Sequence, residues 1–407
     1  MLFLYNFGIY FYSFLVKVFA LFSPKAKLFI QGRQDIFSVL AHKINSQHTH
    51  IWLHFASLGE FEQGRPVLER IKELRPEKRI IVTFFSPSGY EIRKNYALAD
   101  GVFYLPLDTA SNAKKFIDII NPEIAIFTKY EFWYHYFAAL EEKKVPLFLI
   151  SGIFRPNQSF FKWYGGFYRS ILTKITHLFV QNEESERLLK GIGINQVSLS
   201  GDTRFDRVYE NVATVKDLPL VQAFIQQSKV LIAGSTWPQD ELLIAAWMKN
   251  HPDWKVILAP HEIGTAHIDQ LMTLFPQAAR YSTLQQQSPT PEQKILVIDN
   301  IGLLSSLYQY GHIAYIGGGF GAGIHNTLEA AAFGLPVIFG PRYDKFQEAK
   351  DLVALKAAIS IHDDKELESA FQFFIENPAS GKKARDYVVE KKGATEAIMQ
   401  AIVPYLN

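Results

Sequence analysis

The stretch IAYIGGGFGAGIHNTLEAAAFGLPVIFGP, residues 313–341, decides the fold. It opens with the apolar run Ile313–Ile316, which has the length and composition of a buried strand. Five glycines follow between positions 317 and 323, and glycine lets a backbone turn with positive φ and approach a ligand closely. Asn326 and Glu329 have the spacing of a capping box at a helix start, and Val337–Phe339 has the pattern of a second strand. The stretch therefore predicts a βαβ unit with an anion-binding helix N-terminus.

A tight strand-to-helix turn without a ligand would also contain glycine, and capping alone accounts for the asparagine and the glutamate. The excess of glycine favours a ligand, because about two to six residues suffice to join such elements. The spacing is neither G-x-G-x-x-G nor G-x-x-x-x-G-K-[ST], which argues against a dinucleotide site and a P-loop.

Composition sets the outer limits of the interpretation. The chain has 407 residues, enough for two or three domains with sizeable cores. Its formal net charge of +2 gives no reason to expect nucleic acid as a partner. It has no cysteine, which excludes disulfides, thiolate zinc sites and a cysteine nucleophile.

The first 22 residues, MLFLYNFGIYFYSFLVKVFALF, carry one charge, Lys17. About 20 apolar residues can span a bilayer, whereas a segment rich in tyrosine and phenylalanine can instead lie in the membrane interface. Lys25, Lys27 and Arg33 follow and would keep the rest of the chain on the cytoplasmic side. We predict a membrane anchor over residues 1–33; a buried core helix is the alternative, and a cleaved signal peptide lacks its basic start.

From residue 50 onward, strand and helix patterns alternate, which predicts parallel sheets covered by helices on both faces. The fold class is therefore α/β, with two doubly wound Rossmann-like domains that face a cleft. We place an acceptor-binding domain at 34–208, a linker at 209–220 and a donor-binding domain at 221–407, closed by one helix over 382–402. The expected strands are 51–55, 80–85, 102–105, 124–128, 146–151, 177–181 and 197–200, then 230–233, 255–259, 295–298, 313–316 and 337–339.

Two glutamates follow predicted strands of the first domain. Glu60 stands beside Gly59 at a strand-to-helix turn, and Glu131 follows the strand 124–128. The carboxyl ends of parallel strands face the ligand crevice, so either carboxylate could act there as a general base. The alternative is that both are first-turn glutamates stabilised by the helix dipole.

Groups that could hold an anion follow other predicted strands. Arg204 ends the first domain, where its guanidinium could hold a phosphate or carboxylate, or form an ion pair with Asp202 or Asp206. Ser235 and Thr236 end the first strand of the second domain, and their hydroxyls could bind a phosphate.

Histidines and aromatic residues supply weaker signals. His261 follows the strand 255–259 by the same logic. The basic and aromatic segment 155–169 could meet lipid headgroups, or be an amphipathic helix packed on the sheet. The histidines at 48, 50 and 54 lack a convincing set of metal-ligand partners.

Motifs spread over nearly the whole chain resemble those of the 3-deoxy-D-manno-octulosonic acid (Kdo) transferases of lipid A assembly, inverting glycosyltransferases of the GT-B fold. The H-N-x-L-E form of the last motif, together with S-x-G-E near the first strand, is the most specific part of the resemblance. The motifs are A-S-L-G-E at 56–60, S-P-S-G at 86–89, K-Y-E-F-W at 129–133, S-G-D-T-R-F-D at 200–206, G-S-T-W-P at 234–238 and the glycine-rich stretch at 317–337.

The resemblance implies roles for these positions. Glu60 matches the family's general base, which deprotonates an acceptor hydroxyl for attack on CMP-Kdo, and Glu131 and Arg204 match positions that stabilise the transition state. We expect acceptor contacts at Ser57, Gly59 and Arg155, and neither a metal nor another cofactor. The expected donor-binding residues are Ser235, Thr236, Pro260, His261, Ile301, Gly302, Leu303, Asn326, Thr327, Leu328 and Glu329.

Three positions depart from the family pattern. Arg204 stands where the family usually has lysine, which keeps the charge. His261 replaces an arginine and can be neutral near pH 7, while Leu303 replaces an acidic residue and removes a polar contact. Donor binding is therefore where we expect this chain to differ from the family.

The sequence thus predicts transfer of Kdo from CMP-Kdo to a lipid A precursor, a tetraacyl disaccharide of the lipid IVA type, at the cytoplasmic face of the inner membrane. Two other readings stay open. One is another GT-B glycosyltransferase, or an epimerase, that uses a UDP-sugar. The other is a non-catalytic, membrane-attached protein that binds a sugar nucleotide.

Overall fold

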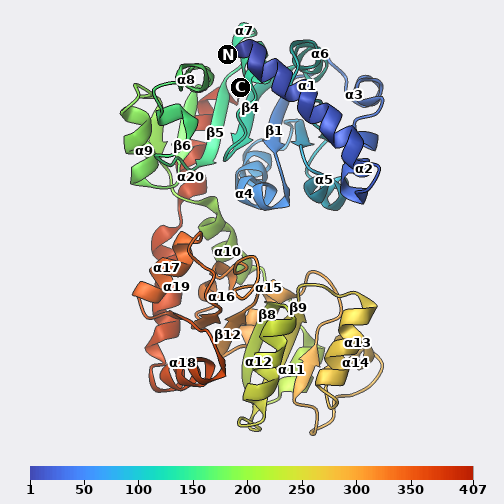
Figure 1. Ribbon diagram of the computed structural model, residues 1–407, viewed down its shortest axis with the longest axis vertical. Coiled ribbons are helices and arrows are strands. Elements are labelled where there is room, and N and C mark those ends of the chain that lie inside the picture. The colour runs from blue at the N-terminus through green and yellow to red at the C-terminus, as the bar shows by residue number, and fades with distance from the viewer. Residues whose placement is uncertain (407) are drawn as a thin grey trace. The chain divides into compact units, whose positions relative to one another are not determined.

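The computed structural model describes residues 1–406, which form two compact units (Figure 1). Unit 1 comprises residues 1–207 and the C-terminal segment from Lys392, and unit 2 comprises Val208–Lys391. Each unit contains one seven-stranded parallel sheet. The predicted α/β class with two doubly wound sheets is confirmed.

The sheet of unit 1 has the strand order β3-β2-β1-β4-β5-β6-β7. The whole of β1, with the sequence HIWLHF, is buried, because helices cover both faces of a parallel sheet. Its strands are β1 (His50–Phe55), β2 (Ile80–Phe84), β3 (Gly101–Tyr104), β4 (Pro122–Thr128), β5 (Leu147–Gly152), β6 (His177–Val180) and β7 (Val197–Leu199).

The helices of unit 1 fill the connections between these strands. Within the basic and aromatic segment 155–169, a short 3₁₀ turn, η1 (Ser159–Phe161), precedes a helix, α8. Helices of unit 1 also precede β1 and follow β7. The helices are α1 (Leu2–Phe19), α2 (Pro24–Gln31), α3 (Ile36–Lys43), α4 (Leu58–Leu74), α5 (Pro87–Arg93), α6 (Ala110–Ile120), α7 (Tyr134–Glu142), α8 (Gly166–Leu172), α9 (Glu183–Lys190) and α10 (Thr203–Ala213).

The sheet of unit 2 has the strand order β10-β11-β9-β8-β12-β13-β14. Its two edge strands, β10 and β14, were not predicted; β10 lies inside the polar segment 277–293 that we expected to be a loop. The strands are β8 (Lys229–Thr236), β9 (Trp254–Pro260), β10 (Ala279–Arg280), β11 (Ile295–Val297), β12 (Ile313–Ile316), β13 (Val337–Phe339) and β14 (Ala358–Ser360). The helices are α11 (Pro219–Ile225), α12 (Pro238–Met248), α13 (Thr265–Leu274), α14 (Tyr281–Leu284), α15 (Leu304–Leu307), η2 (Tyr308–Tyr310), α16 (Leu328–Ala332), α17 (Gln347–Ala354), α18 (Asp364–Glu376) and α19 (Ala379–Lys391).

The C-terminal segment belongs to unit 1, which corrects the predicted domain limits. The expected helix 382–402 is broken at Gly393, whose φ of +114° suits glycine, into α19 and α20 (Ala394–Ile402). Asp206 holds the start of α20, since its carboxylate accepts hydrogen bonds from the Thr395 amide at 2.7 Å and the Thr395 hydroxyl at 2.8 Å. Ile398 and Met399 then pack in the core of unit 1 beside α4. The predicted linker is also partly helical, because α10 runs on to Ala213.

The N-terminal helix α1 lies along unit 1 (Figure 1). The Tyr5 hydroxyl donates to Asp108 at 2.5 Å, and Asn6 Oδ1 lies 2.6 Å from His135 Nε2. No residue of α1 is buried, so the core-helix alternative is wrong. Among residues 1–406, α1 is the one helix that passes the length and hydropathy test for a membrane span.

Close backbone packing explains part of the glycine-rich stretch. A Cβ atom on Gly319 would lie 2.6 Å from the Cα and N atoms of Gly340, which follows β13. A Cβ atom on Gly321 would meet no atom nearer than the Gly318 carbonyl oxygen at 3.6 Å. The first glycine is therefore required by the contact between two loops, whereas the second is not.

We expect Gly319→Ala to destabilise the protein by about 1–3 kcal/mol, because the added methyl group meets backbone that cannot move aside easily. Gly321→Ala is the matched control and should unfold close to the wild type. Urea unfolding followed by circular dichroism measures both midpoints. Equal midpoints for the two variants would show that the contact with Gly340 does not require glycine at position 319.

Candidate active site

The strand order of unit 1 reverses between β1 and β4. The chain runs outward from β1 through β2 to β3, then returns to β4 on the other side of β1. In open α/β sheets, ligands bind at the carboxyl ends of the strands where the order reverses. Glu60 follows β1 and Glu131 follows β4, so the two predicted carboxylates occupy this position.

Glu60 lies in the first turn of α4 and is half-buried. Its carboxylate accepts a hydrogen bond from the Ala56 amide at 2.6 Å, which folds the side chain back over the end of β1. Burial, and then the negative charge of Glu131, raise the pKa of Glu60 to about 7. A carboxyl group with such a pKa suits general base catalysis near neutral pH.

Glu131 is buried and held by two neighbouring side chains. Its Oε2 accepts a hydrogen bond from Trp133 Nε1 at 2.8 Å and lies 3.1 Å from His54 Nε2. The other ring nitrogen of His54 lies 2.8 Å from the Thr83 hydroxyl on β2. This role of His54 was not predicted from the sequence. The signal that could have found it is an imidazole inside an apolar strand, β1, which pairs with the strand that precedes Glu131.

Two non-glycine residues have left-handed backbone at this edge of the sheet. Lys129 after β4 has φ +62°, and Ser151 in β5 has φ +54°. Such conformations cost of order 1–3 kcal/mol each and gather at functional sites. The positive charge of Lys129 also lowers the pKa of Glu60, against the larger effects of burial and of Glu131.

Arg204 lies in the first turn of α10 and forms an ion pair with Asp202. Its Nε and Nη2 atoms each lie 2.8 Å from Asp202 Oδ2. Asp202 also accepts from Gln63 Nε2 at 3.3 Å, one helical turn after Glu60 on α4. Asp202 thus links the start of α10 to the first part of the helix that carries the candidate base.

The predicted acceptor residues lie at the ends of three different elements. Ser57 is the residue before α4 and Gly59 is exposed in its first turn. Arg155 follows β5, and its Nη1 donates to the Tyr130 hydroxyl at 3.1 Å. Tyr130 directly precedes Glu131, so Arg155 lies near the same sheet edge.

In unit 2 the strand order reverses between β8 and β12. The predicted pair Ser235 and Thr236 ends β8, and the glycine-rich loop follows β12. Ser235 has a left-handed φ of +54°, while Thr236 is buried and donates from its hydroxyl to Glu241 at 3.1 Å. The second switch point therefore coincides with the segments predicted to bind the donor.

A cavity of about 480 Å³ adjoins this loop. Trp237 and His261 stack with ring centroids 4.7 Å apart, His261 and His325 stack at 4.4 Å, and Trp237 Nε1 donates to His325 Nε2 at 3.1 Å. Burial, and then His261, lower the pKa of His325 to about 4, so it is neutral near pH 7. Several residues around the cavity were assigned no role from the sequence. The cavity is lined by Trp237, Pro238, Gln239, Asp240, Gly318, Phe320, Gly321, Ala322, Gly323 and His325.

Asp240 fixes the base of the glycine-rich loop. Its carboxylate accepts hydrogen bonds from the Gly318 amide at 3.0 Å, the Trp237 amide at 2.9 Å and the Tyr315 hydroxyl at 2.7 Å. These bonds join the end of β8 to the end of β12. The loop is therefore held in place before any ligand binds.

The predicted capping box is wrong in its details. Thr327, not Asn326, is the N-cap residue of the helix; Asn326 Oδ1 accepts from the Leu328 amide at 3.1 Å, and Glu329 accepts from the Asn326 side chain at 3.0 Å. The helix that follows, α16, has only five residues. Thr327 is buried, and the anion-binding role of this segment stays a prediction.

The remaining predicted donor residues lie in two loops of unit 2. Pro260 ends β9, and His261, which follows it, is exposed; its amide donates to the Thr236 carbonyl at 2.9 Å. Ile301 is 86% exposed, ahead of Gly302 and of Leu303 at the start of α15. The structure brings His261 to the cavity beside the glycine-rich loop through its ring stacking.

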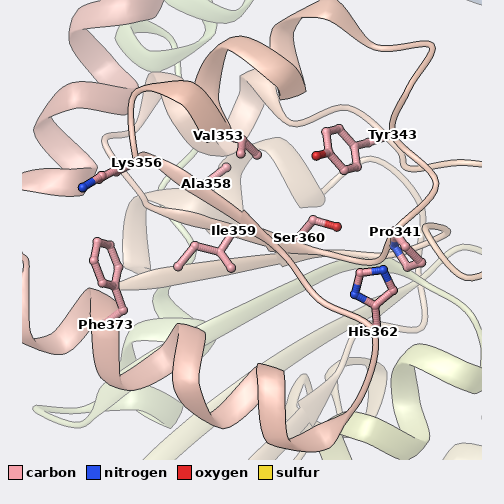
Figure 2. A pocket seen from close by; sticks show the side chains of 9 residues that line it. All are labelled: Pro341, Tyr343, Val353, Lys356, Ala358, Ile359, Ser360, His362 and Phe373. Atoms are coloured by element: carbon pink, nitrogen blue, oxygen red, sulfur yellow. The ribbon is translucent and has the colours of Figure 1, made fainter.

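A second cavity in unit 2, of about 540 Å³, lies beside the edge strand β14 (Figure 2). None of the predicted site residues lines it. Figure 2 shows Tyr343, Ser360 and His362 on one side, and Lys356 and Phe373 on the other. It is separate from the strand-order reversal between β8 and β12.

Known proteins resemble this chain in sequence and in fold. Residues 32–207 match the family model described as 3-deoxy-D-manno-octulosonic-acid transferase (kdotransferase). The 3-deoxy-D-manno-octulosonic acid transferase of Aquifex aeolicus is 29% identical over 316 residues, which cover 76% of this chain and 80% of that protein. The one of Rickettsia bellii is 26% identical in a 419-residue alignment over 98% of this chain and 97% of that protein.

Solved structures agree on the fold alone. The UDP-GlcNAc 2-epimerase of Neisseria meningitidis aligns with a TM-score of 0.61 at 15% identity, over 88% of this chain and all of that one (100%). The UDP-N-acetylglucosamine 2-epimerase of Rickettsia bellii gives a TM-score of 0.55 at 12% identity. With the sequence matches, these findings show that the chain is similar to 3-deoxy-D-manno-octulosonic acid transferases over most of its length and has a GT-B fold.

Proposed function

We propose that the protein transfers Kdo from CMP-Kdo to a hydroxyl group of a lipid A precursor, a tetraacyl disaccharide of the lipid IVA type, in lipopolysaccharide biosynthesis. The similarity to 3-deoxy-D-manno-octulosonic acid transferases supports Kdo as the transferred sugar. The observation that carries the chemistry is Glu60, a half-buried carboxyl group at the strand-order reversal of unit 1 with a pKa raised to about 7.

The reaction needs one base and one leaving group. Glu60 takes the proton of the acceptor hydroxyl as its oxygen attacks the anomeric carbon of Kdo; the bond from that carbon to the phosphate oxygen breaks, and CMP leaves with the electron pair. Attack opposite the leaving group inverts the anomeric centre. Glu131, fixed by His54 and Trp133, and Arg204, fixed by Asp202, are proposed to stabilise the transition state.

Unit 2 is proposed to bind the CMP part of the donor. Ser235, His261 and the segment from Asn326 to Glu329 come from the loops after β8, β9 and β12, where α/β sheets bind ligands. Because Asp240 already holds the glycine-rich loop through three hydrogen bonds, little ordering would be needed on binding.

We propose that α1 attaches the protein to the cytoplasmic face of the inner membrane. Support comes from its apolar side chains turned to solvent, such as Phe3, Phe7 and Phe14, which are at least 60% exposed. Large exposed apolar surfaces mark interaction sites, and amphipathic helices lie in the membrane interface. The contacts of Tyr5 and Asn6 with unit 1 favour a helix that lies in the interface over one that spans the bilayer.

Donor choice separates this proposal from the UDP-sugar alternative. We expect the full-length protein to bind CMP at least about tenfold more tightly than UMP or UDP, because a site that hydrogen-bonds the cytosine amino group rejects the carbonyl of uracil. Isothermal titration calorimetry with the free nucleotides measures this directly. Preference for uridine nucleotides would reject CMP-Kdo as the donor.

Replacing the candidate base tests the chemistry. We expect Glu60→Gln to lower kcat by about 10²- to 10⁴-fold, because the acceptor hydroxyl loses its proton acceptor, while CMP binding stays close to that of the wild type. The measurement is Kdo transfer to a tetraacyl disaccharide, with products weighed by mass spectrometry. Glu62→Gln, on the same helix, is the control and should keep its activity; full activity of Glu60→Gln would point to another base.

The effect of the Glu131 charge on the pKa of Glu60 predicts how the reaction rate depends on pH. Because Glu60 must be ionised to accept a proton, kcat/KM should rise by about tenfold per pH unit below pH 7 and level off above it. Glu131→Gln removes the charge that raises the pKa of Glu60, so the acid limb should move to lower pH, whatever the loss of overall rate. Glu73→Gln, at the exposed end of α4, should leave the limb in place; an upward shift in Glu131→Gln would contradict the assignment.

A further inference from the structure

An apolar hollow of about 340 Å³ lies between α1, α2 and the loop after β2. Its volume falls in the usual range of small-molecule sites, about 300–1,000 Å³. We call it the α1–α2 hollow. It is lined by Tyr12 and Val16 of α1, by Ser23, Lys25, Ala26 and Phe29 at or in α2, and by Phe85, Ser86 and Pro87 after β2.

The floor of the hollow is fixed by Arg33. Its guanidinium donates to the carbonyl oxygen of Phe29 at 3.0 Å and to that of Phe85 at 2.7 Å, and lies 3.6 Å from the centre of the Phe29 ring. The rings of Phe29 and Phe85 meet edge to face with centroids 5.2 Å apart. These contacts hold the walls in place, so the hollow is preformed.

The two serine hydroxyls of the lining are already engaged. The Ser23 hydroxyl accepts from the Ala26 amide at 3.4 Å, and the Ser86 hydroxyl lies 3.1 Å from that of Ser88. Lys25 is the only charged side chain in the lining, and it is exposed. A sugar would need several hydrogen bonds that these groups do not offer, whereas a hydrocarbon chain would need none.

One wall of the hollow is connected to each candidate catalytic group through one intervening residue. The ring of Phe85 lies 4.8 Å from that of Trp133, which donates to Glu131 at 2.8 Å. The amide of the next residue, Ser86, donates to the Ala56 carbonyl at 2.8 Å, and the Ala56 amide bonds to Glu60. A chain in the hollow would therefore end beside the carboxylates proposed to act on the acceptor.

The other side of the hollow continues into the exposed apolar face of α1. Val16 and Tyr12 line the hollow, while Phe19, three residues after Val16 and therefore on the same side of the helix, is 60% exposed. Lipid in contact with this face could enter the hollow without crossing a polar surface. Lys25 at its rim and Lys27, two positions later in the sequence, provide positive charge for an anionic headgroup.

From this continuity, the apolar lining and the connection to the carboxylates through Trp133 and Ala56, we propose that the α1–α2 hollow binds one acyl chain of the acceptor lipid and so positions its headgroup at Glu60. The proposal rests on the proposed transfer to an acylated acceptor. It makes the hollow the part of the protein that distinguishes an acylated acceptor from the same sugar without its chains.

Filling the hollow tests the proposal. In Ala26→Trp and Val16→Trp, an indole would occupy the space of the chain, so we expect KM for a tetraacyl disaccharide to rise by at least about tenfold. Transfer to the fully deacylated disaccharide should stay within about twofold of the wild type, which also shows that the variants fold. Leu28→Trp, on α2 but outside the lining, is the matched control and should behave as the wild type with both acceptors.

The outcomes separate the two proposals. If the wild type uses both acceptors equally well, or if the filled variants lose both activities alike while Leu28→Trp keeps them, the acyl site is wrong but the transferase activity stands. If the wild type transfers Kdo to neither, the proposed function fails. A disaccharide with a photoactivatable acyl chain still tests the hollow in that case: labels on Tyr12, Val16 or Phe85 support it, and labels confined to Phe3, Phe7 and Phe14 overturn it.

Discussion

The candidate site of unit 1 depends on one constraint, the approach of two carboxylates at the same edge of the sheet. β1 and β4 are neighbours in the sheet, so the residues that follow them cannot avoid each other. The charge of Glu131 adds to burial in raising the pKa of Glu60 to about 7. The folded protein therefore binds this proton more tightly than the unfolded chain, whose glutamate titrates near pH 4.5, so Glu60 disfavours folding increasingly as pH rises from about 4.5 to 7. Hydrogen bonds from the Ala56 amide and the Trp133 indole, with the contact to His54, offset that cost and keep the two groups in separate orientations.

The same topology explains why one chain can use two similar sheets for different tasks. Each sheet reverses its strand order once, and in each case the loops at the reversal carry the polar groups. In unit 1 these groups are carboxylates, which suit proton transfer. In unit 2 they are hydroxyls, backbone amides and stacked aromatic rings around Trp237, which suit a nucleotide. Function thus differs because the loops differ, while the sheets supply the same geometry.

The sequence predicted well what periodicity and burial control. Central parallel strands are apolar throughout, so β1, β4, β8 and β12 were recognised with small errors at their ends. The edge strands β10 and β14 were missed because β10 has only two residues and β14, with the sequence AIS, lacks an apolar run such as the VIF of β13. The return of α20 to unit 1 was missed for another reason: it depends on Asp206, nearly 190 residues away in the sequence, accepting hydrogen bonds from Thr395.

In the candidate site, too, local features were predicted and long-range contacts were not. The identities of Glu60, Glu131 and Arg204 came from their places after predicted strands and from the family resemblance. Their partners did not, because His54 meets Glu131 only when two strands 70 residues apart lie side by side. The tandem stack of Trp237, His261 and His325 likewise joins three loops. Local pattern identifies which residues carry charge; pairing across a sheet decides what holds that charge in place.

The N-terminal helix shows how one sequence can serve two environments. Tyr5 and Asn6 are the residues of α1 that bond to unit 1 through Asp108 and His135, so a polar side lies on the protein while phenylalanines stay outside. Burial raises the pKa of Asp108, with which Tyr5 bonds, so this carboxylate would be costly without its partners. A helix that left unit 1 to cross a bilayer would strand Asp108 without the Tyr5 hydroxyl and carry the Tyr5 and Asn6 polar groups into hydrocarbon. Both losses are avoided when the helix stays on the protein and turns its phenylalanine side outward. The apolar length that first suggested a membrane span is therefore better explained by a helix that keeps one side on the protein and turns its phenylalanines outward.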